Sequence, residues 1–316
     1  MTTPAAMTVS YATLLERVGH FLFGIRSSYS ADQTSDIEEC IADGLRDVYS
    51  AHSWSFFRPI YKLTTVAPYS TGTITSAAGV VTLDGGTFPS WAAYGVLKID
   101  DDYYEVNTRD GDTQVTLEDT TVTQATAVSY ELSQAEYDLP TTYEAIEGDL
   151  WYEAGQSDFY PTVKQRHDSE ITRLLQDDPY TDRPLYYGIR AAEFDPTVGS
   201  RRRLALYPLP DAVYVLHARM QLRPTMIDST NMYPIGGESL AQVITEACLA
   251  AAERNFDEQH GNHTRMLEEL LPRAIQADLM ATTPVTLGGD APAGESGDLS
   301  ARSVLVGTIT FNGTTM

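Results

Sequence analysis

The chain has 316 residues, of which 42% are hydrophobic, so it can bury more than one core and is too apolar to be disordered throughout. It carries 44 acidic and 21 basic residues, a net charge of −23, and this sign opposes tight binding to nucleic acid, which relies on Lys and Arg at the phosphates. No run of about 18 apolar residues occurs, so no segment is expected to span a membrane. The acidic surplus favours solubility by self-repulsion, or a surface that DNA passes without sticking.

Two helices are predicted near the N-terminus. The first spans residues 10–23 and stops at Gly24, which suits a left-handed C-terminal cap. The second spans residues 35–51, where Ser35 and Glu38 have the spacing of a capping box. Both helices carry apolar stripes at helical spacing, and each stripe is expected to face a shared core.

A change in composition marks an inserted segment at residues 68–134. This segment is rich in Thr, Val, Gly and Asp and has no helical period. Short alternating runs occur at residues 80–83, 96–99, 103–106, 115–117 and 128–130. Turns rich in Asp and Gly separate them, as in an antiparallel barrel or sandwich of five or six strands.

After the insertion, strands and one short helix are predicted. The strands lie at residues 149–152 and 185–189, and the helix starts at Asp168 or Ser169 and ends before Pro179. Two more strands follow, around a proline-rich corner that spans residues 207–211. Proline cannot donate a ladder hydrogen bond, so Pro208 and Pro210 are expected in the turn and not inside a strand.

Two further helices are predicted before the C-terminal region. One spans about residues 236–256, and the next begins near Asn262 or Thr264 and continues to Leu279. Pro272 lies inside the second helix and is expected to kink or restart it.

These elements predict an α+β fold in three parts. Residues 1–67 and 135–282 form a body with a helical bundle core and β-hairpin elements. Residues 68–134 form the inserted antiparallel β barrel or sandwich, and residues 283–316 form an extended C-terminal arm. The sequence of residues 303–311 favours a strand, which either pairs with a partner or folds back onto the chain's own β domain.

Motifs for catalysis or metal binding do not occur in the sequence. His260 and His263 form a close pair without a third ligand nearby, and the acidic run at residues 100–102 lacks the spacing of a calcium loop. Cys40 and Cys248 fall in apolar helical patterns and are expected to be unpaired core thiols. We therefore expect no enzymatic activity, no cofactor and no metal.

Arg201, Arg202 and Arg203 form the one basic run of the chain. They are either a solvated loop and strand start or a patch for inter-subunit or partner salt bridges. Three arginines are too few for a nucleic-acid site in so acidic a chain.

The order of these segments resembles the head-to-tail adaptor (connector) proteins of tailed bacteriophages. The resemblance lies in the N-terminal helix pair, residues 44–49 leading into Trp54-Ser55-Phe56, the Tyr207-Pro208-Leu209-Pro210-Asp211 corner with Arg223-Pro224, and the C-terminal helix pair. Together these segments cover about half of the chain. The inserted domain resembles the insertions of longer members of that family.

The resemblance implies a ring that joins the portal to the tail and gives DNA a conduit. Its implied partners are the portal protein, tail or nozzle and terminator proteins, and copies of itself in a twelve-fold ring. In this family the C-terminal helix and tail grip the portal. Here that points to Leu279, Met280, Val304, Leu305, Val306, Ile309 and Phe311.

Two other functions remain open from the sequence. One is a tail-associated protein that binds a carbohydrate or receptor through the inserted domain, and the other is a hydrolase, which lacks a recognisable nucleophile and base. The first residues lack the basic end and apolar stretch of a signal peptide, so synthesis in the host cytoplasm and a final place in the virion neck are expected.

Overall fold

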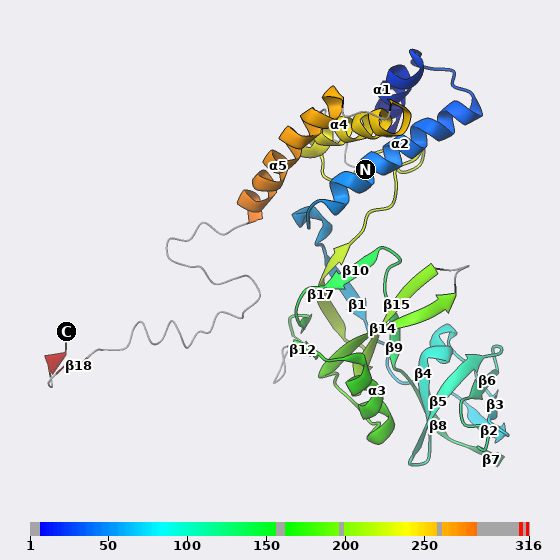
Figure 1. The fold of residues 1–316 in the computed structure, drawn as a ribbon. Helices are drawn as coiled ribbons and strands as arrows, with labels where there is room; N and C mark the ends of the chain where they lie inside the picture. The colour runs from blue at the N-terminus through cyan, green and yellow to red at the C-terminus, as the bar shows by residue number, and fades with distance from the viewer. Residues whose placement is uncertain are drawn as a thin grey trace.

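The chain folds as α+β, and its helices and sheets occupy separate parts (Figure 1). The computed structural model describes residues 7–155, 162–195, 199–257, 261–282, 310–311 and 314–315. The α-helices of these residues are α1 (Tyr11–Phe23), α2 (Ala31–Ser50), α3 (Asp168–Asp177), α4 (Ala241–Ala252) and α5 (Asn262–Thr282). Shorter helical segments are η1 (Ser55–Phe57), η2 (Ser90–Tyr94), η3 (Glu238–Leu240) and the π-helical η4 (Glu253–Asp257).

Helices α1, α2, α4 and α5 pack around one apolar core, and we call this group the helical unit. Its fully buried side chains include Leu14 on α1, Leu45 on α2 and Ile244 on α4. The chain enters the unit at its N-terminus and returns to it only after both sheets are complete (Figure 1). Segments far apart in sequence therefore share this core.

The ends of α1 and α2 follow from local capping. Ser10 caps α1 and Gly24 ends it in the left-handed conformation, as predicted. Helix α2 begins a turn earlier than predicted, because the Ser30 hydroxyl accepts from the Gln33 N–H and the Gln33 side chain accepts from the Ser30 N–H. The capping box predicted at Ser35 is therefore wrong, since Ser30 and Gln33 supply one first.

Two details of the last helices also differ from the predictions. Helix α4 is shorter than the predicted range 236–256, because η3 and η4 replace its ends. Helix α5 continues through Pro272 as one helix, so the chain does not restart there.

The closest approach of α2 and α4 is at Gly44. A Cβ atom added there would lie 2.5 Å from the backbone nitrogen of Cys248 and 2.6 Å from its Cα. Cys40 and Cys248 are buried and free, as predicted. Small residues at this crossing let the two helix backbones pack closely.

The inserted segment forms one curled seven-stranded antiparallel sheet, which we call the inserted β unit. Its strands are β2 (Thr73–Ala77), β3 (Val80–Asp84), β4 (Gly95–Ile99), β5 (Asp102–Arg109), β6 (Gln114–Leu117), β7 (Gln124–Val128) and β8 (Tyr130–Gln134). They lie in the order β7-β2-β3-β6-β5-β4-β8 around a core with Ile74, Leu97 and Leu132 at its centre. Five or six strands were predicted. Strand β2 was missed because Ile74 is the one large apolar residue in it, and the single run predicted at residues 128–130 spans the end of β7 and the start of β8.

A second sheet has eight strands, and we call it the larger sheet. Its strands are β1 (Ile60–Thr64), β9 (Glu136–Asp138), β10 (Tyr143–Ile146), β11 (Leu150–Tyr152), β12 (Thr162–Gln165), β14 (Tyr186–Asp195), β15 (Gly199–Tyr207) and β17 (Val215–Leu222). The order is β1-β17-β11-β12-β14-β15-β9, and β10 pairs with β17. Helix α3 packs on this sheet through Ile171, which contacts Ala205 and Tyr207.

The proline-rich corner joins strands that are not neighbours. Strand β15 pairs with β14 and β9, whereas β17 pairs with β1, β10 and β11. Between them, β16 (Leu209–Pro210) pairs with β13 (Thr181–Asp182), so the expectation that Pro210 lies outside any strand is wrong. The Leu209 N–H supplies the bond to the Tyr180 carbonyl, and this short bridge needs no donor from Pro210.

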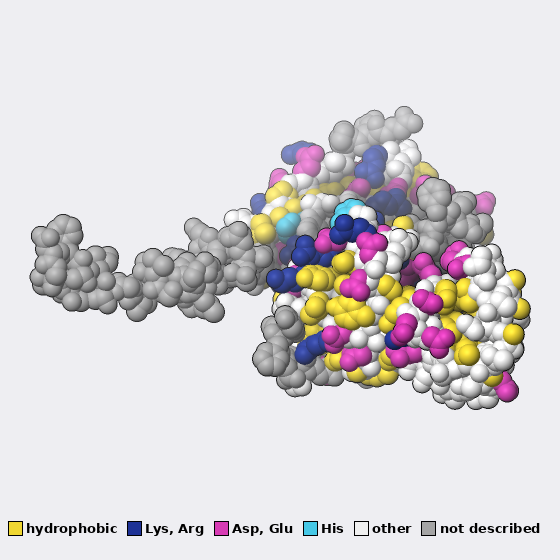
Figure 2. All heavy atoms as spheres, turned by 90° about the horizontal axis from the view of Figure 1, so that it is seen from below, with side chains coloured by type: hydrophobic (Ala, Val, Ile, Leu, Met, Phe, Trp, Pro, Cys, Tyr) yellow, Lys and Arg dark blue, Asp and Glu magenta, His cyan; other side chains and the backbone are white. Residues whose placement is uncertain are grey.

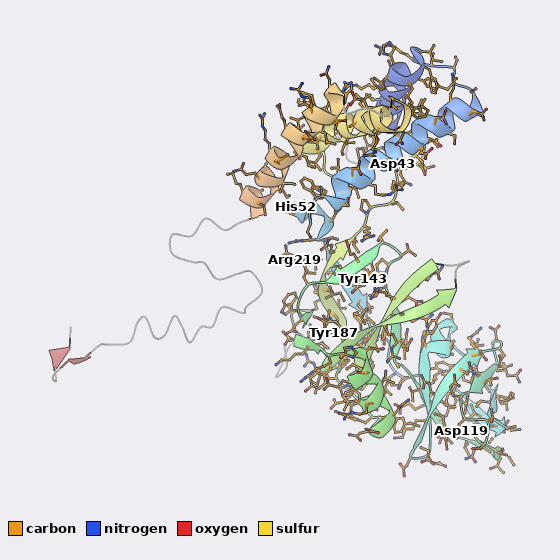
Figure 3. The ribbon with its side chains drawn as sticks, in the orientation of Figure 1. Asp43, His52, Asp119, Tyr143, Tyr187 and Arg219 are labelled. Atoms are coloured by element: carbon orange, nitrogen blue, oxygen red, sulfur yellow. The ribbon has the colours of Figure 1, made fainter. Side chains whose placement is uncertain are left out.

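The helical unit meets the larger sheet near His52 and Arg219 (Figure 3). Asp278 of α5 accepts hydrogen bonds from the Ser55 N–H at 3.0 Å and from its hydroxyl at 2.5 Å. On the sheet side, Glu147 pairs with Arg219 at 3.2 Å. The Asp278 contacts join α5 to η1, and the hydrogen bond from the Ser53 hydroxyl to Gln221 of β17 at 3.0 Å joins the segment before η1 to the sheet.

Candidate functional site

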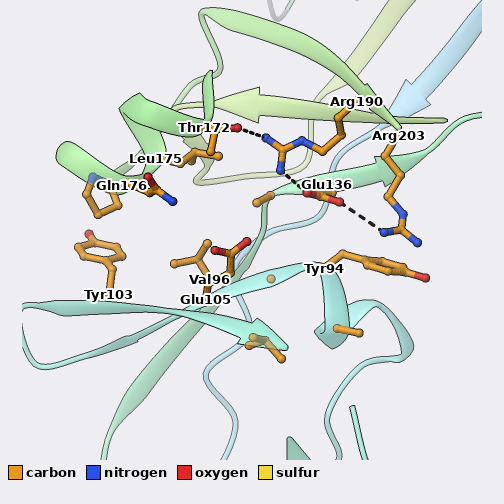
Figure 4. A pocket seen from close by; sticks show the side chains of 15 residues that line it. Tyr94, Val96, Tyr103, Glu105, Glu136, Thr172, Leu175, Gln176, Arg190 and Arg203 are labelled. Carbon is orange, nitrogen blue, oxygen red and sulfur yellow. Dashed lines mark hydrogen bonds and ion pairs between the residues drawn. The ribbon is translucent and has the colours of Figure 1, made fainter. Parts of the chain in front are cut away.

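A pocket of about 370 Å³ lies where the inserted β unit, the larger sheet and α3 meet (Figure 4). We call it the junction pocket. Segment η2 and strands β4 and β5 supply one wall, and α3 with strands β9, β14 and β15 supplies the other. Its labelled lining residues are Tyr94, Val96, Tyr103, Glu105, Glu136, Thr172, Leu175, Gln176, Arg190 and Arg203. A pocket of this size at a domain junction is large enough for a small ligand.

Arg190 is the centre of an ionic network on one wall of the pocket. Its guanidinium pairs with Glu136, donates to Asp168 at 2.9 Å and donates to the Thr172 hydroxyl at 2.9 Å. Burial opposes its charge, but Glu136 and Asp168 outweigh burial and raise the pKa of Arg190. Since its donors are used within the chain, Arg190 has a structural role in holding this wall.

Arg203 joins the same network to the inserted β unit. Its guanidinium donates to Asp138 at 2.8 Å, lies 3.5 Å from Glu136 and stacks 4.0 Å from the ring centroid of Tyr94. Tyr94 belongs to η2 of the inserted β unit, whereas Arg203 belongs to β15 of the larger sheet. This contact fixes the two sheets together at the pocket.

Glu105 reaches the pocket from β5 of the inserted β unit (Figure 4). Burial raises the pKa of Glu105, the neighbouring Glu136 raises it further, and Arg190 lowers it. The pocket thus presents one carboxylate of raised pKa between two tyrosine rings, Tyr94 and Tyr103. This arrangement suits hydrogen bonding and stacking with a polar ligand.

We next searched for side chains that could bind a metal ion in the part of the chain that the structure describes. No group of three or more His, Cys, Asp or Glu side chains there is placed to hold a metal ion. His263, predicted beside His260, instead pairs its Nδ1 with Glu246 at 2.7 Å, and residue 260 lies outside the described residues.

The structure separates the three predicted arginines. Arg203 pairs within its own chain, as described above, and its side chain is mostly buried. Arg201 and Arg202 are exposed near the start of β15, opposite Glu193 and Ala191 of β14. Arg201 also has an interaction within the chain, so the hypothesis of a salt bridge to a partner rests mainly on Arg202.

Of the predicted portal-binding residues, two lie in a described helix. Leu279 and Met280 are in the last turns of α5, with 48% and 67% of their surface exposed. Phe311 lies in the two-residue strand β18 (Thr310–Phe311), which pairs with β19 (Thr314–Thr315). Val304, Leu305, Val306 and Ile309 lie outside the described residues.

The residues of the junction pocket were not predicted. Glu136 and Arg190 are 54 positions apart, and no spacing rule links two strands whose order in the sheet is unknown. Arg203 is the one lining residue among the predicted site residues. It was predicted only as a member of the run Arg201–Arg203, and the sequence did not show which of the three faces inward. Alternation along β15 could not have indicated it, because Leu204, Ala205 and Leu206 are all buried and both faces of the strand are apolar there.

In comparisons with known proteins, no family model and no curated protein matches this chain. None of the described helices is long and apolar enough to cross a membrane. The function must therefore be inferred from the residues and their geometry.

Proposed function

We propose that the chain is a structural virion protein that forms a ring between the portal and the tail of a tailed phage. Its proposed partners are the portal protein on one side, a tail, nozzle or terminator protein on the other, and copies of itself around the ring. DNA would pass through the lumen without specific binding. The proposed role is mechanical, and no catalytic step is assigned to it.

The observation that carries this proposal is a pair of apolar surfaces on the helical unit. The first, the α5 surface, consists of Met266, Leu279 and Met280 of α5 and Phe256 of the preceding η4, each at least 41% exposed. The second, the linker surface, consists of Met226, Met232, Tyr233 and Ile235, each at least 43% exposed. Exposed apolar groups of this kind mark surfaces that contact other proteins.

The two surfaces lie on different elements of the helical unit. Helix α5 packs mainly on α4. The linker, residues 223–237 between β17 and η3, lies along α1 and α2. The Tyr11 N–H donates to Met232 O at 2.7 Å, and the Tyr49 hydroxyl donates to Ile235 O at 3.0 Å. A closed ring of identical subunits needs a head-to-tail interface made of two different surfaces. The helical unit offers such a pair, and the last turns of α5 are also the place that the family resemblance assigns to the portal contact.

The charge of the chain supports a passage for DNA. The net charge is −23, and acidic side chains are scattered between apolar ones over the β units on the face drawn in Figure 2. Phosphates gain no counterion release on such a surface, so DNA can slide along it.

Electron microscopy of the chain mixed with portal rings of the same phage tests the proposal. We expect an added collar on the rings. The variant Met280→Asp should abolish the collar, because it places a charge on the α5 surface. Ile60→Asp is the matched control, since Ile60 is 69% exposed on the larger sheet, and it should leave the collar intact. A complete, folded chain that never adds a collar would show that the proposal is wrong.

A truncated chain tests the part played by the C-terminal arm. Among the residues that the structure describes, Ile275 is the last in sequence to pack on the apolar core of the helical unit. Deleting residues 284–316 should therefore leave the fold intact and abolish the collar. If the truncated chain still forms the collar, the portal contact lies on the helices alone.

The junction pocket favours a second candidate function, a tail-associated carbohydrate- or receptor-binding protein. Tyr94 and Tyr103 could stack on sugar rings while Glu105 accepts hydrogen bonds from hydroxyl groups. A glycan array distinguishes the two candidates. If the chain binds a glycan and Tyr103→Ala removes this binding, the second candidate is supported. If the chain binds no glycan on the array, the carbohydrate-binding function is wrong.

A further inference from the structure

A second pocket, of about 330 Å³, collects positive charge on this acidic chain. Its lining includes Tyr143, Glu144, Arg201, Arg202 and Arg223, and we call it the basic pocket. It lies on the larger sheet, near Tyr143 of β10 (Figure 3). None of its lining residues belongs to the junction pocket.

Backbone hydrogen bonds hold the walls of the basic pocket in place. The Leu139 N–H donates to Arg202 O at 3.2 Å, and the Arg223 N–H donates to Thr142 O at 2.7 Å. The segment 139–144 is thereby fixed between β15 and the end of β17. Three arginines from two separate parts of the chain meet at this segment because of these bonds.

The basic pocket has more cations than its own carboxylate can balance. Glu144 accepts from Arg223 at 2.9 Å and from the Gln221 amide at 3.1 Å. Arg201 is engaged elsewhere in the chain and adds its charge to the rim. Arg202 is exposed and makes no ion pair with any described residue. Because Glu144 balances Arg223, the charge of Arg202 is the one that no described carboxylate in the pocket balances.

Tyr143 adds a hydroxyl to this charge. Burial raises the pKa of Tyr143, and Arg202 lowers it. The hydroxyl is therefore a neutral group that lies within the electrostatic reach of Arg202. An anion that enters the pocket can therefore contact both the Arg202 guanidinium and the Tyr143 hydroxyl.

We propose that the basic pocket binds the carboxylates of an acidic protein segment. The planar guanidinium of arginine matches a carboxylate with two parallel hydrogen bonds. Nucleic acid fits less well, because it is a long polyanion and the field of a chain with a net charge of −23 repels it along its length. A short acidic protein segment places only a few charges near the chain, and these lie inside the basic pocket. A second copy of this chain carries such a segment, since Asp100 and Asp101 form an exposed turn after β4 and Asp102, also exposed, begins β5.

NMR of the arginine side chains tests this site on the complete protein. The probe is a blocked peptide of three consecutive aspartates, titrated against protein labelled at the arginine Nε. We expect shifts confined to the signals of Arg201, Arg202 and Arg223. Arg202→Gln should weaken peptide binding about tenfold, the cost of one charge-assisted contact.

Arg219→Gln is the matched control. Arg219 lies on β17 and pairs with Glu147 outside the basic pocket, so this variant should bind the peptide like the parent chain. Equal loss in both variants would reveal non-specific attraction and overturn the site. Inorganic phosphate and a short single-stranded oligonucleotide are run in parallel. If they bind and the peptide does not, the assignment to an acidic protein segment is wrong. The site is independent of the proposed ring, since binding of the peptide needs no portal.

Discussion

The guanidinium of Arg203 lies 4.0 Å from the ring centroid of Tyr94, and this contact joins two sheets that have separate cores. The same guanidinium is bound to Asp138 of β9, four residues after the end of the last strand of the inserted β unit. Arg203 thus holds both the exit strand and η2. This side chain therefore helps to fix the position of the inserted β unit against the larger sheet.

Replacing Arg203 by Ala should loosen the inserted β unit. The loss of one cation–π contact and one ion pair predicts a fall of about 2 kcal/mol in the free energy of unfolding. Hydrogen exchange should rise at residues 92–96 while the core of the helical unit stays protected. Arg202→Ala is the control, because Arg202 is exposed on the same strand. Equal exchange in the two variants would contradict this role of Arg203.

Gly44→Ala should destabilise the helical unit. Alanine has a higher helix propensity than glycine by about 1 kcal/mol, which alone would stabilise α2. The new methyl group, however, would lie 2.5 Å from the backbone nitrogen of Cys248, so the two helices must separate. We expect a net loss of about 2 kcal/mol or more in a urea denaturation curve. Gly111→Ala, where the added Cβ meets nothing within 4 Å, should change stability little.

Local signals explain which helices the sequence predicts well. Ser10 and Gly24 bound α1 by side-chain and backbone chemistry within a few residues, so that helix is predicted correctly. The start of α5 was predicted at Asn262 or Thr264. Helix α5 does begin at Asn262, but its cap comes from elsewhere, because the backbone N–H groups of His263 and Thr264 donate to the Glu253 carboxylate of the preceding η4. A cap supplied by another element leaves no local pattern in the sequence.

Glu253→Ala should unfold the first turn of α5. Burial would raise the pKa of Glu253, but the hydrogen bonds from the His263 and Thr264 N–H groups outweigh it and lower the pKa. The carboxylate therefore stabilises the fold above its ordinary pKa of 4.5, and this contribution is lost as the pH falls. We expect a cost of about 1–2 kcal/mol at neutral pH in thermal unfolding, as for other N-caps. Glu269→Ala, on an exposed position of α5, should cost far less.

Glu105→Gln should have the opposite effect. The pKa of Glu105 is raised above its ordinary value of 4.5, so its charged form opposes folding. The folded chain holds this proton more tightly than the unfolded chain, and stability falls as the pH rises through the window above 4.5. The amide should therefore raise the melting temperature at neutral pH and lose that advantage below 4.5. A melting temperature that drops at neutral pH would show that the carboxylate is needed in its charged form.

The candidate sites differ in how far the sequence indicates them. The arginine run was visible, but which arginine faces inward depends on the pairing of β15 with β9. The basic pocket also needs Arg223, which a turn outside β17 brings to the same place. Such sites depend on the order of strands in a sheet, and strand order follows from packing of the whole chain rather than from local pattern.

The number of copies bound to one portal ring tests the central claim most directly. Native mass spectrometry of portal rings incubated with excess chain gives this number without imaging. We expect one copy for each portal subunit, which adds 34.8 kDa per subunit to the ring. Portal rings that keep their own mass in the presence of the complete, folded chain would contradict the proposed function.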